Sequence, residues 1–105
     1  MTVVEFVMRK LCSGIEEFEA TPKERLDINL ENLESKLKNV GVQEITRLGC
    51  FLLVLFEDTG TVCHIYPNGK ILIKANMKDD AEKVCKLIYE LVDGQPRSLS
   101  NTSSD

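Results

Sequence analysis

The fold is decided by residues 50–75, CFLLVLFEDTGTVCHIYPNGKILIKA, in which three apolar runs alternate with two turn sequences. The runs 50–56, 61–66 and 70–75 are rich in β-branched and aromatic residues, a composition typical of strands. Between them, Glu57-Asp58-Thr59-Gly60 and Pro67-Asn68-Gly69 have the residue types of hairpin turns. Because short turns join antiparallel neighbours, this stretch predicts a meander of three strands.

The flanking segments extend this meander into an α+β domain. Residues 42–48 and 2–11 (TVVEFVMRKL) favour strands, and residues 16–19 are either a strand extension or a loop. The predicted order is therefore a strand, a helix, four strands and a helix. We expect a curved antiparallel sheet with two helices on one face, in a single domain over residues 1–94, followed by a flexible tail over residues 95–105.

The first helix is predicted by an apolar seam at spacings of four and three residues: Leu26, Leu30, Leu33, Leu37 and Val40. Its start is ambiguous. Thr21 followed by Pro22 has the form of a capping box, whereas Asp27 or Asn29 would cap a shorter helix. The second helix is predicted over residues 76–92 by a similar seam, and Gly94 and Pro96 end it.

Composition limits the classes of partner. The chain has 105 residues, a formal net charge of −4 and a pI of about 5.0. Broad nucleic-acid binding is disfavoured, because it depends on many Lys and Arg contacts to phosphate. No apolar run approaches the ~20 residues of a membrane span, and Glu5, Arg9 and Lys10 interrupt the apolar N-terminal residues. We therefore expect a cytoplasmic protein with no membrane partner.

The residues that usually carry chemistry are scattered. The four cysteines, at positions 12, 50, 63 and 85, form no C-x-x-C pair, so we expect reduced thiols packed as small hydrophobes and no metal site. His64 is the single histidine, and its neighbour Cys63 points to the opposite face of a strand. We therefore expect no catalytic residues and no cofactor, and a structural or interfacial role for His64.

Two segments suggest a family. HIYPNGKILI, residues 64–73, resembles the LIFxSGKxVxTG hairpin of the TATA-box-binding protein family, and ANMKDDAEKVCK, residues 75–86, resembles its GAKSEEDAKLAARK segment. Leu26-Asp27-Ile28 is similar to the LDL that opens the family's first helix. The likeness covers about four-fifths of the chain. It implies a single TBP-like repeat whose concave sheet face binds nucleic acid.

The same resemblance has two departures that bear on DNA. The family inserts two Phe wedges per repeat into the minor groove, and the corresponding positions here hold Tyr66 and Gly49. A glycine has no side chain with which to unstack a base step. The family also joins two tandem repeats into a saddle, whereas this chain has one. Nucleic acid therefore remains a possible partner, but it is disfavoured.

The strand 50–56 is apolar at every position, although one face of such a sheet should be polar. If Cys50, Leu52, Val54 and Phe56 pack on the helices, the other set faces away from them. The predicted helix-free face consists of Arg47, Phe51, Leu53, Leu55, Val62, His64, Tyr66, Leu72 and Lys74.

An apolar surface of several hundred Å² exceeds what a monomer usually exposes. The sequence leaves three alternatives for what covers this surface: the chain's own termini, a second copy or another protein, and nucleic acid. A non-catalytic interaction domain that binds itself or a protein is the favoured hypothesis.

Overall fold

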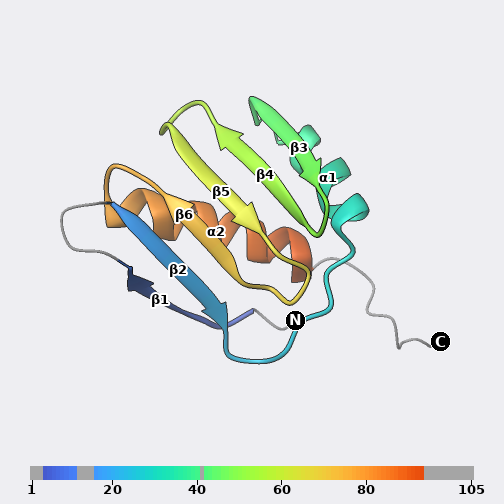
Figure 1. Ribbon diagram of the computed structural model, residues 1–105, viewed down its shortest axis with the longest axis horizontal. Coiled ribbons are helices and arrows are strands. Elements are labelled where there is room, and N and C mark those ends of the chain that lie inside the picture. The colour runs from blue at the N-terminus through green and yellow to red at the C-terminus, as the bar shows by residue number, and fades with distance from the viewer. Residues whose placement is uncertain (1–3, 12–15, 41, 94–105) are drawn as a thin grey trace.

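The computed structural model describes residues 4–11, 16–40 and 42–93. These residues form one six-stranded antiparallel sheet and two α-helices (Figure 1). In chain order the elements are β1 (Phe6–Lys10), β2 (Glu17–Pro22), α1 (Leu30–Asn39), β3 (Glu44–Leu48), β4 (Phe51–Phe56), β5 (Thr61–Ile65), β6 (Ile71–Lys74) and α2 (Lys78–Asp93). The predicted α+β class is confirmed, and the predicted elements occur in the predicted order. The tail expected over residues 95–105 lies outside the described residues.

The strands are arranged in the order β1-β2-β6-β5-β4-β3, and every neighbouring pair is antiparallel. The meander β3–β6 was predicted. Strand β2 resolves the alternatives left open for the acidic segment: it is a separate strand, which pairs with β1 on one side and with β6 on the other. It forms because Phe18 and Ala20, both buried, alternate with Glu17 and Glu19, whose charged side chains point to the other face.

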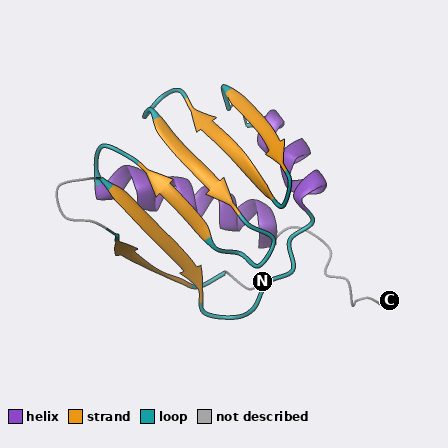
Figure 2. Cartoon of the chain, in the orientation of Figure 1, coloured by secondary structure: helices purple, strands orange, loops and turns teal. Residues whose placement is uncertain are grey.

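Both helices cover the same side of the sheet. Helix α1 packs on β4, and α2 packs on β2, β5 and β6; Figure 2 shows α2 crossing the sheet on the side away from the viewer. The core lies between these two layers and includes Phe18, Ala20, Leu33, Leu37, Leu52, Val54, Cys63, Ile65, Ile71, Ile73, Val84 and Ile88. Of the helices in the described residues, neither is long and apolar enough to cross a membrane.

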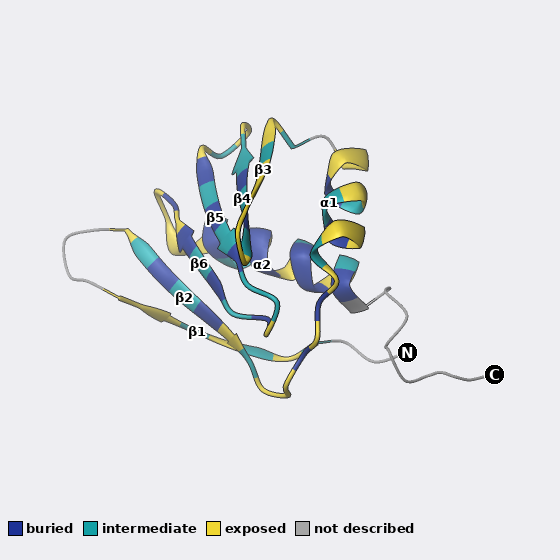
Figure 3. Ribbon diagram, turned by 45° about the vertical axis from the view of Figure 1, so that its right-hand side comes forward, coloured by how far each residue is buried: buried dark blue, intermediate teal, exposed yellow. Residues whose placement is uncertain are grey.

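Helix α1 is shorter than its apolar seam. Asn29 is its N-cap, and the Asn29 side chain accepts a hydrogen bond from the backbone N–H of Asn32 at 3.1 Å. Of the three starts considered, the cap at Asn29 is therefore the one observed. Leu26 and Ile28 belong to the extended segment before the helix, and both are buried. The face of α1 that points away from the sheet is solvent-exposed (Figure 3).

The turn between β5 and β6 is tied to the opposite layer. Gly69 has a φ of +98° and is buried, and an added Cβ would lie 2.7 Å from Cγ of Pro22. The hydroxyl of Tyr89, on α2, donates a buried hydrogen bond of 2.6 Å to the Gly69 carbonyl. The backbone N–H of Ile28 donates to the Pro67 carbonyl at 2.9 Å. These contacts fix the end of the hairpin that presents Tyr66 and Lys70.

Candidate functional site

The side of the sheet that faces away from the helices is the helix-free face. Its decisive feature is β4, in which Leu52 and Val54 are fully buried under the helices, while Phe51, Leu53 and Leu55 alternate with them on the other side. The second set is only half-buried. The structure therefore confirms the alternation predicted for this strand, and nothing in the described residues seals its outer side.

Cross-strand partners extend this surface on both sides of β4. The register places His64 opposite Leu53, Val62 opposite Leu55, and Leu72 opposite His64, and directly opposed residues share a face. Figure 3 shows the resulting bands of buried and half-buried residues along β4 and β5. The polar residues Glu44 and Thr46 of β3 lie on the same face, opposite Leu55 and Leu53. We call the remaining residues of this surface the apolar patch; it consists of Leu48, Phe51, Leu53, Leu55, Val62, His64, Tyr66 and Leu72.

Three rings meet at one end of the apolar patch. The Phe51 ring centroid lies 5.3 Å from that of His64 and 5.3 Å from that of Tyr66, in tilted arrangements. Such separations are typical of favourable aromatic pairs. The rings shield one another, which is one reason why these residues are half-buried instead of fully exposed.

One residue expected on this face is not there. Arg47 is paired with Leu52, so it lies on the helix side of the sheet, at the exposed edge strand. Its placement was wrong by one residue of register: a two-residue turn, Gly49-Cys50, sets Leu48 opposite Phe51. Leu48, 42% exposed, takes the place predicted for Arg47. Gly49 adopts a φ of +55° in this turn, so the glycine at this position was the sequence signal for it.

The part of the same face formed by β1 and β2 is charged. The carboxylate of Glu19 pairs with the Arg9 guanidinium at 2.9 Å and with the Lys70 ammonium at 3.2 Å. Hydrogen bonds from Lys70 and Arg9 lower the pKa of Glu19 below its usual value of 4.5. We call this region the charged half; Lys74, exposed and opposite Glu17, marks its border with the apolar patch.

The chain's own N-terminal residues do not cover the apolar patch as far as they are described. Residues 6–10 form β1 at the far edge of the sheet, and the partly buried Val4, Phe6 and Met8 pack against the core. The C-terminal alternative concerns residues beyond 93, which lie outside the described part of the chain.

The three cysteines in the described residues, Cys50, Cys63 and Cys85, are free thiols. Burial raises the pKa of the Cys63 thiol well above 9.0 and that of the Cys85 thiol to about 12, so both stay protonated at neutral pH. Cys50 is exposed in the β3–β4 turn, which corrects the expectation that it packs as a small hydrophobe. Cys12 lies outside the described residues.

His64 has an apolar environment. Its cross-strand neighbours are Leu53 and Leu72, and its ring contact is with Phe51. Within residues 4–11, 16–40 and 42–93, no three His, Cys, Asp or Glu side chains are grouped so that they could hold a metal ion. The neighbours Leu53, Leu72 and Phe51 have no group that accepts or supplies a proton, so this environment favours packing of His64 against an apolar surface.

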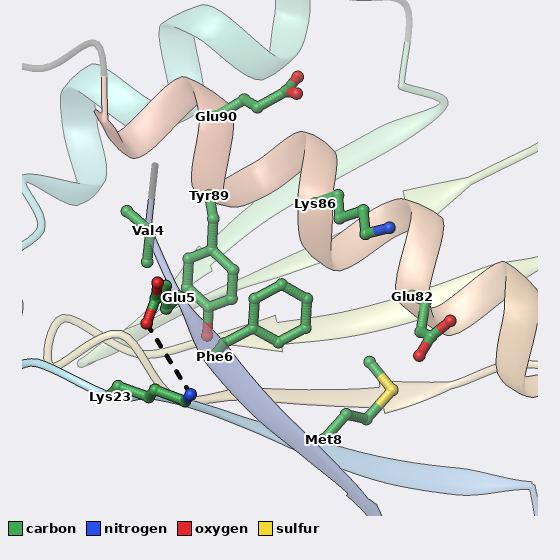
Figure 4. A pocket seen from close by; sticks show the side chains of 9 residues that line it. All are labelled: Val4, Glu5, Phe6, Met8, Lys23, Glu82, Lys86, Tyr89 and Glu90. Atoms are coloured by element: carbon green, nitrogen blue, oxygen red, sulfur yellow. Dashed lines mark ion pairs between the residues drawn. The ribbon is translucent and has the colours of Figure 1, made fainter. Parts of the chain in front are cut away.

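A groove of about 470 Å³ lies on the other side of the molecule, between β1 and α2 (Figure 4). Phe6, Met8 and Tyr89 form its apolar floor, and the Phe6 and Tyr89 rings lie 4.9 Å apart. Its rim carries both signs of charge: Glu5, Lys23, Glu82, Lys86 and Glu90. Because these charges largely offset one another, the groove favours neither an anionic nor a cationic ligand.

The geometry thus offers one surface of a single chemical kind, the apolar patch. No family model, curated protein or solved structure matches this chain. The apolar patch and its border are therefore the features of the described residues that bear on function.

Proposed function

We propose that this chain is a non-catalytic interaction domain that self-associates through the apolar patch. The observation that carries the proposal is the composition of β4, whose two sides are equally apolar although the helices cover only one of them. In a sheet with one covered face, the other face is ordinarily polar. The core of a single chain therefore does not explain why the outer residues Phe51, Leu53 and Leu55 are apolar.

Burial of the apolar patch supplies a driving force for association. Each Å² of apolar surface removed from water contributes roughly 25 cal/mol, and these side chains are already restrained by their strands and by one another. A second copy is the preferred partner, because most soluble oligomers are symmetric and twofold dimers are the commonest. A gently twisted sheet face also packs readily on another, about 10 Å away.

Nucleic acid is the second candidate, favoured by the three clustered rings of Phe51, His64 and Tyr66, since bases stack on such platforms. The charges around the patch oppose it. Arg9 and Lys70 are already paired with Glu19, and Arg47 lies on the other side of the sheet. Titration with single-stranded and duplex oligonucleotides at low salt tests this candidate; binding at micromolar concentration would favour it over self-association.

Charge placed in the apolar patch tests the proposal. We expect Phe51→Asp and Leu53→Asp each to weaken self-association at least ~30-fold, since a carboxylate buried in the interface would lack a partner. Sedimentation velocity over a concentration series measures the dissociation constant, and circular dichroism verifies that each variant is folded.

The matched control is Val7→Asp, on the same face but in the charged half, where Val7 is 54% exposed. This variant should sediment like the unmodified chain. The proposal fails if folded Phe51→Asp and Leu53→Asp associate as strongly as the unmodified chain, or if all three variants weaken association equally.

A further inference from the structure

Residues that face one another across the strands form rows on the helix-free face. One row consists of Glu44, Leu55, Val62 and Lys74, from β3 to β6. It has an acid at one border, a base at the other and two apolar residues between them. Glu44 and Lys74 are three strand spacings apart, about 14 Å, too far to pair within one chain. Among the described residues neither of them forms an ion pair.

We infer that a second copy lies face to face on the apolar patch, with the twofold axis parallel to the strands and between β4 and β5. This inference rests on the proposed self-association and specifies its geometry. Rotation about such an axis places β3 over the partner's β6 and β4 over the partner's β5. Each residue keeps its position along the strand direction. Glu44 of each chain therefore lies over the partner's Lys74, which gives two identical ion pairs at opposite borders of the interface.

Three pairs of apolar or aromatic positions also match under this rotation. Leu55 lies over the partner's Val62, Leu53 over the partner's His64, and Phe51 over the partner's Tyr66. Leu72 lies over the partner's Thr46, and Leu48 lies over the partner's Lys70 at the rim. The Lys70 ammonium keeps its ion pair with Glu19 of its own chain, 3.2 Å away, so it is not left without a partner. The two sheets then have nearly parallel strands, as in aligned sheet packing.

The alternative axis in the interface plane, perpendicular to the strands, is less favourable. It keeps the strand order and reverses the level along the strands. Lys74 would then lie over the partner's Lys70, and Glu44 over the partner's Leu48, because Leu48 and Lys70 belong to the row at the opposite end of the patch. Like charges would meet at one border, and a carboxylate would be buried against a leucine at the other.

Charge reversal in two separate chains tests the inferred axis. Glu44→Lys alone and Lys74→Glu alone should each weaken self-association about 3- to 30-fold, because both border contacts become repulsive. An equimolar mixture of the two variants should form a heterodimer with an affinity within about threefold of the unmodified homodimer. In that heterodimer both border contacts again join opposite charges. Sedimentation of fluorescently labelled chains measures the three dissociation constants.

Glu24→Lys and Lys78→Glu are matched controls, since both sites are exposed and lie outside the apolar patch. Their mixture should show no preference for a heterodimer. If the Glu44→Lys and Lys74→Glu mixture gains nothing while Phe51→Asp still disrupts the dimer, the inferred axis is wrong and the proposed function stands. If Phe51→Asp also leaves association unchanged, both fail.

Discussion

The two halves of the helix-free face meet the solvent in different ways. In the charged half, Glu19 lies between Arg9 and Lys70, and each of these charges has a partner within the same chain. In the apolar patch, Leu53 faces His64 and Phe51 contacts Tyr66, and none of the ion pairs among the described residues involves these four side chains. The charged half presents paired charges to the solvent beside one exposed apolar residue, Val7, whereas the apolar patch contains no Asp, Glu, Lys or Arg. This difference is the reason why we propose the apolar patch, and not the charged half, as the interaction surface.

The largest expected effect comes from making the apolar patch resemble the charged half. Leu53 and Thr46 are directly opposed, so Leu53→Lys with Thr46→Glu creates a cross-strand ion pair like that of Arg9 and Glu19. In the inferred dimer these two positions lie over the partner's His64 and the partner's Leu72, so neither new charge meets an opposite charge on the other chain. We expect association to weaken more than 100-fold, while the free energy of unfolding changes by no more than about 2 kcal/mol. Light scattering after gel filtration gives the mass, and urea denaturation gives the stability.

The same exchange in the charged half is its control. Val7 and Thr21 are directly opposed and exposed, and Val7→Lys with Thr21→Glu should leave the mass unchanged. If the Leu53→Lys, Thr46→Glu variant stays dimeric, the proposed difference between the two halves is wrong.

A smaller effect is expected from the ion pairs of the charged half. Because the pKa of Glu19 is lowered in the folded state, ionised Glu19 stabilises the fold at pH values above 4.5, and this stabilisation is lost as the pH falls below that value. Glu19→Gln should cost about 0.5–1 kcal/mol of unfolding free energy at neutral pH and nothing in acid. Urea denaturation of diluted protein at successively lower pH measures both limits.

Association should be indifferent to this change. Glu24→Gln, at an exposed carboxylate in the loop after β2, serves as the control and should cost nothing measurable. If Glu19→Gln still lowers the free energy of unfolding at low pH, the stabilisation does not come from the ionised carboxylate of Glu19.

The smallest effect concerns the rim of the inferred dimer. With the axis parallel to the strands, the β4–β5 turns of both chains lie at the same end of the interface, and each carries the exposed residues Glu57 and Asp58. Their mutual repulsion opposes association and is screened by salt. Glu57→Gln should tighten the dimer about twofold at low ionic strength and have no effect at high salt. If the affinity of the dimer at low salt is unchanged, the two turns do not lie close together in the dimer.

The sequence predicts this fold well where turn chemistry and alternation agree. Gly60 and Gly69 both have positive φ values in the predicted turns, and they fix the pairing of β4, β5 and β6. The alternation of Leu52 with Leu53 then assigns the two faces of β4. This is why Phe51, Leu53, Leu55, Val62, His64 and Tyr66 occur together as predicted.

The remaining errors have local causes. Strand β2 contains only two buried apolar residues, Phe18 and Ala20. They alternate with glutamates, so the segment has too few apolar residues for its sequence alone to identify it as a strand. Arg47 was misplaced because a two-residue turn at Gly49 shifts β3 by one position, and such a shift reverses every side chain of a strand. Glu19 and Lys70 meet only through the pairing of β2 with β6, a contact between distant segments that no local pattern reveals.

The most direct test of the account is sedimentation equilibrium of the unmodified chain over a wide range of concentrations. If the apolar patch is an interface, the mass rises with concentration from that of one chain, 11.8 kDa, to twice that value. A constant mass of 11.8 kDa up to hundreds of micromolar would contradict the account, because the outer side of β4 would then remain stable in water without a cover.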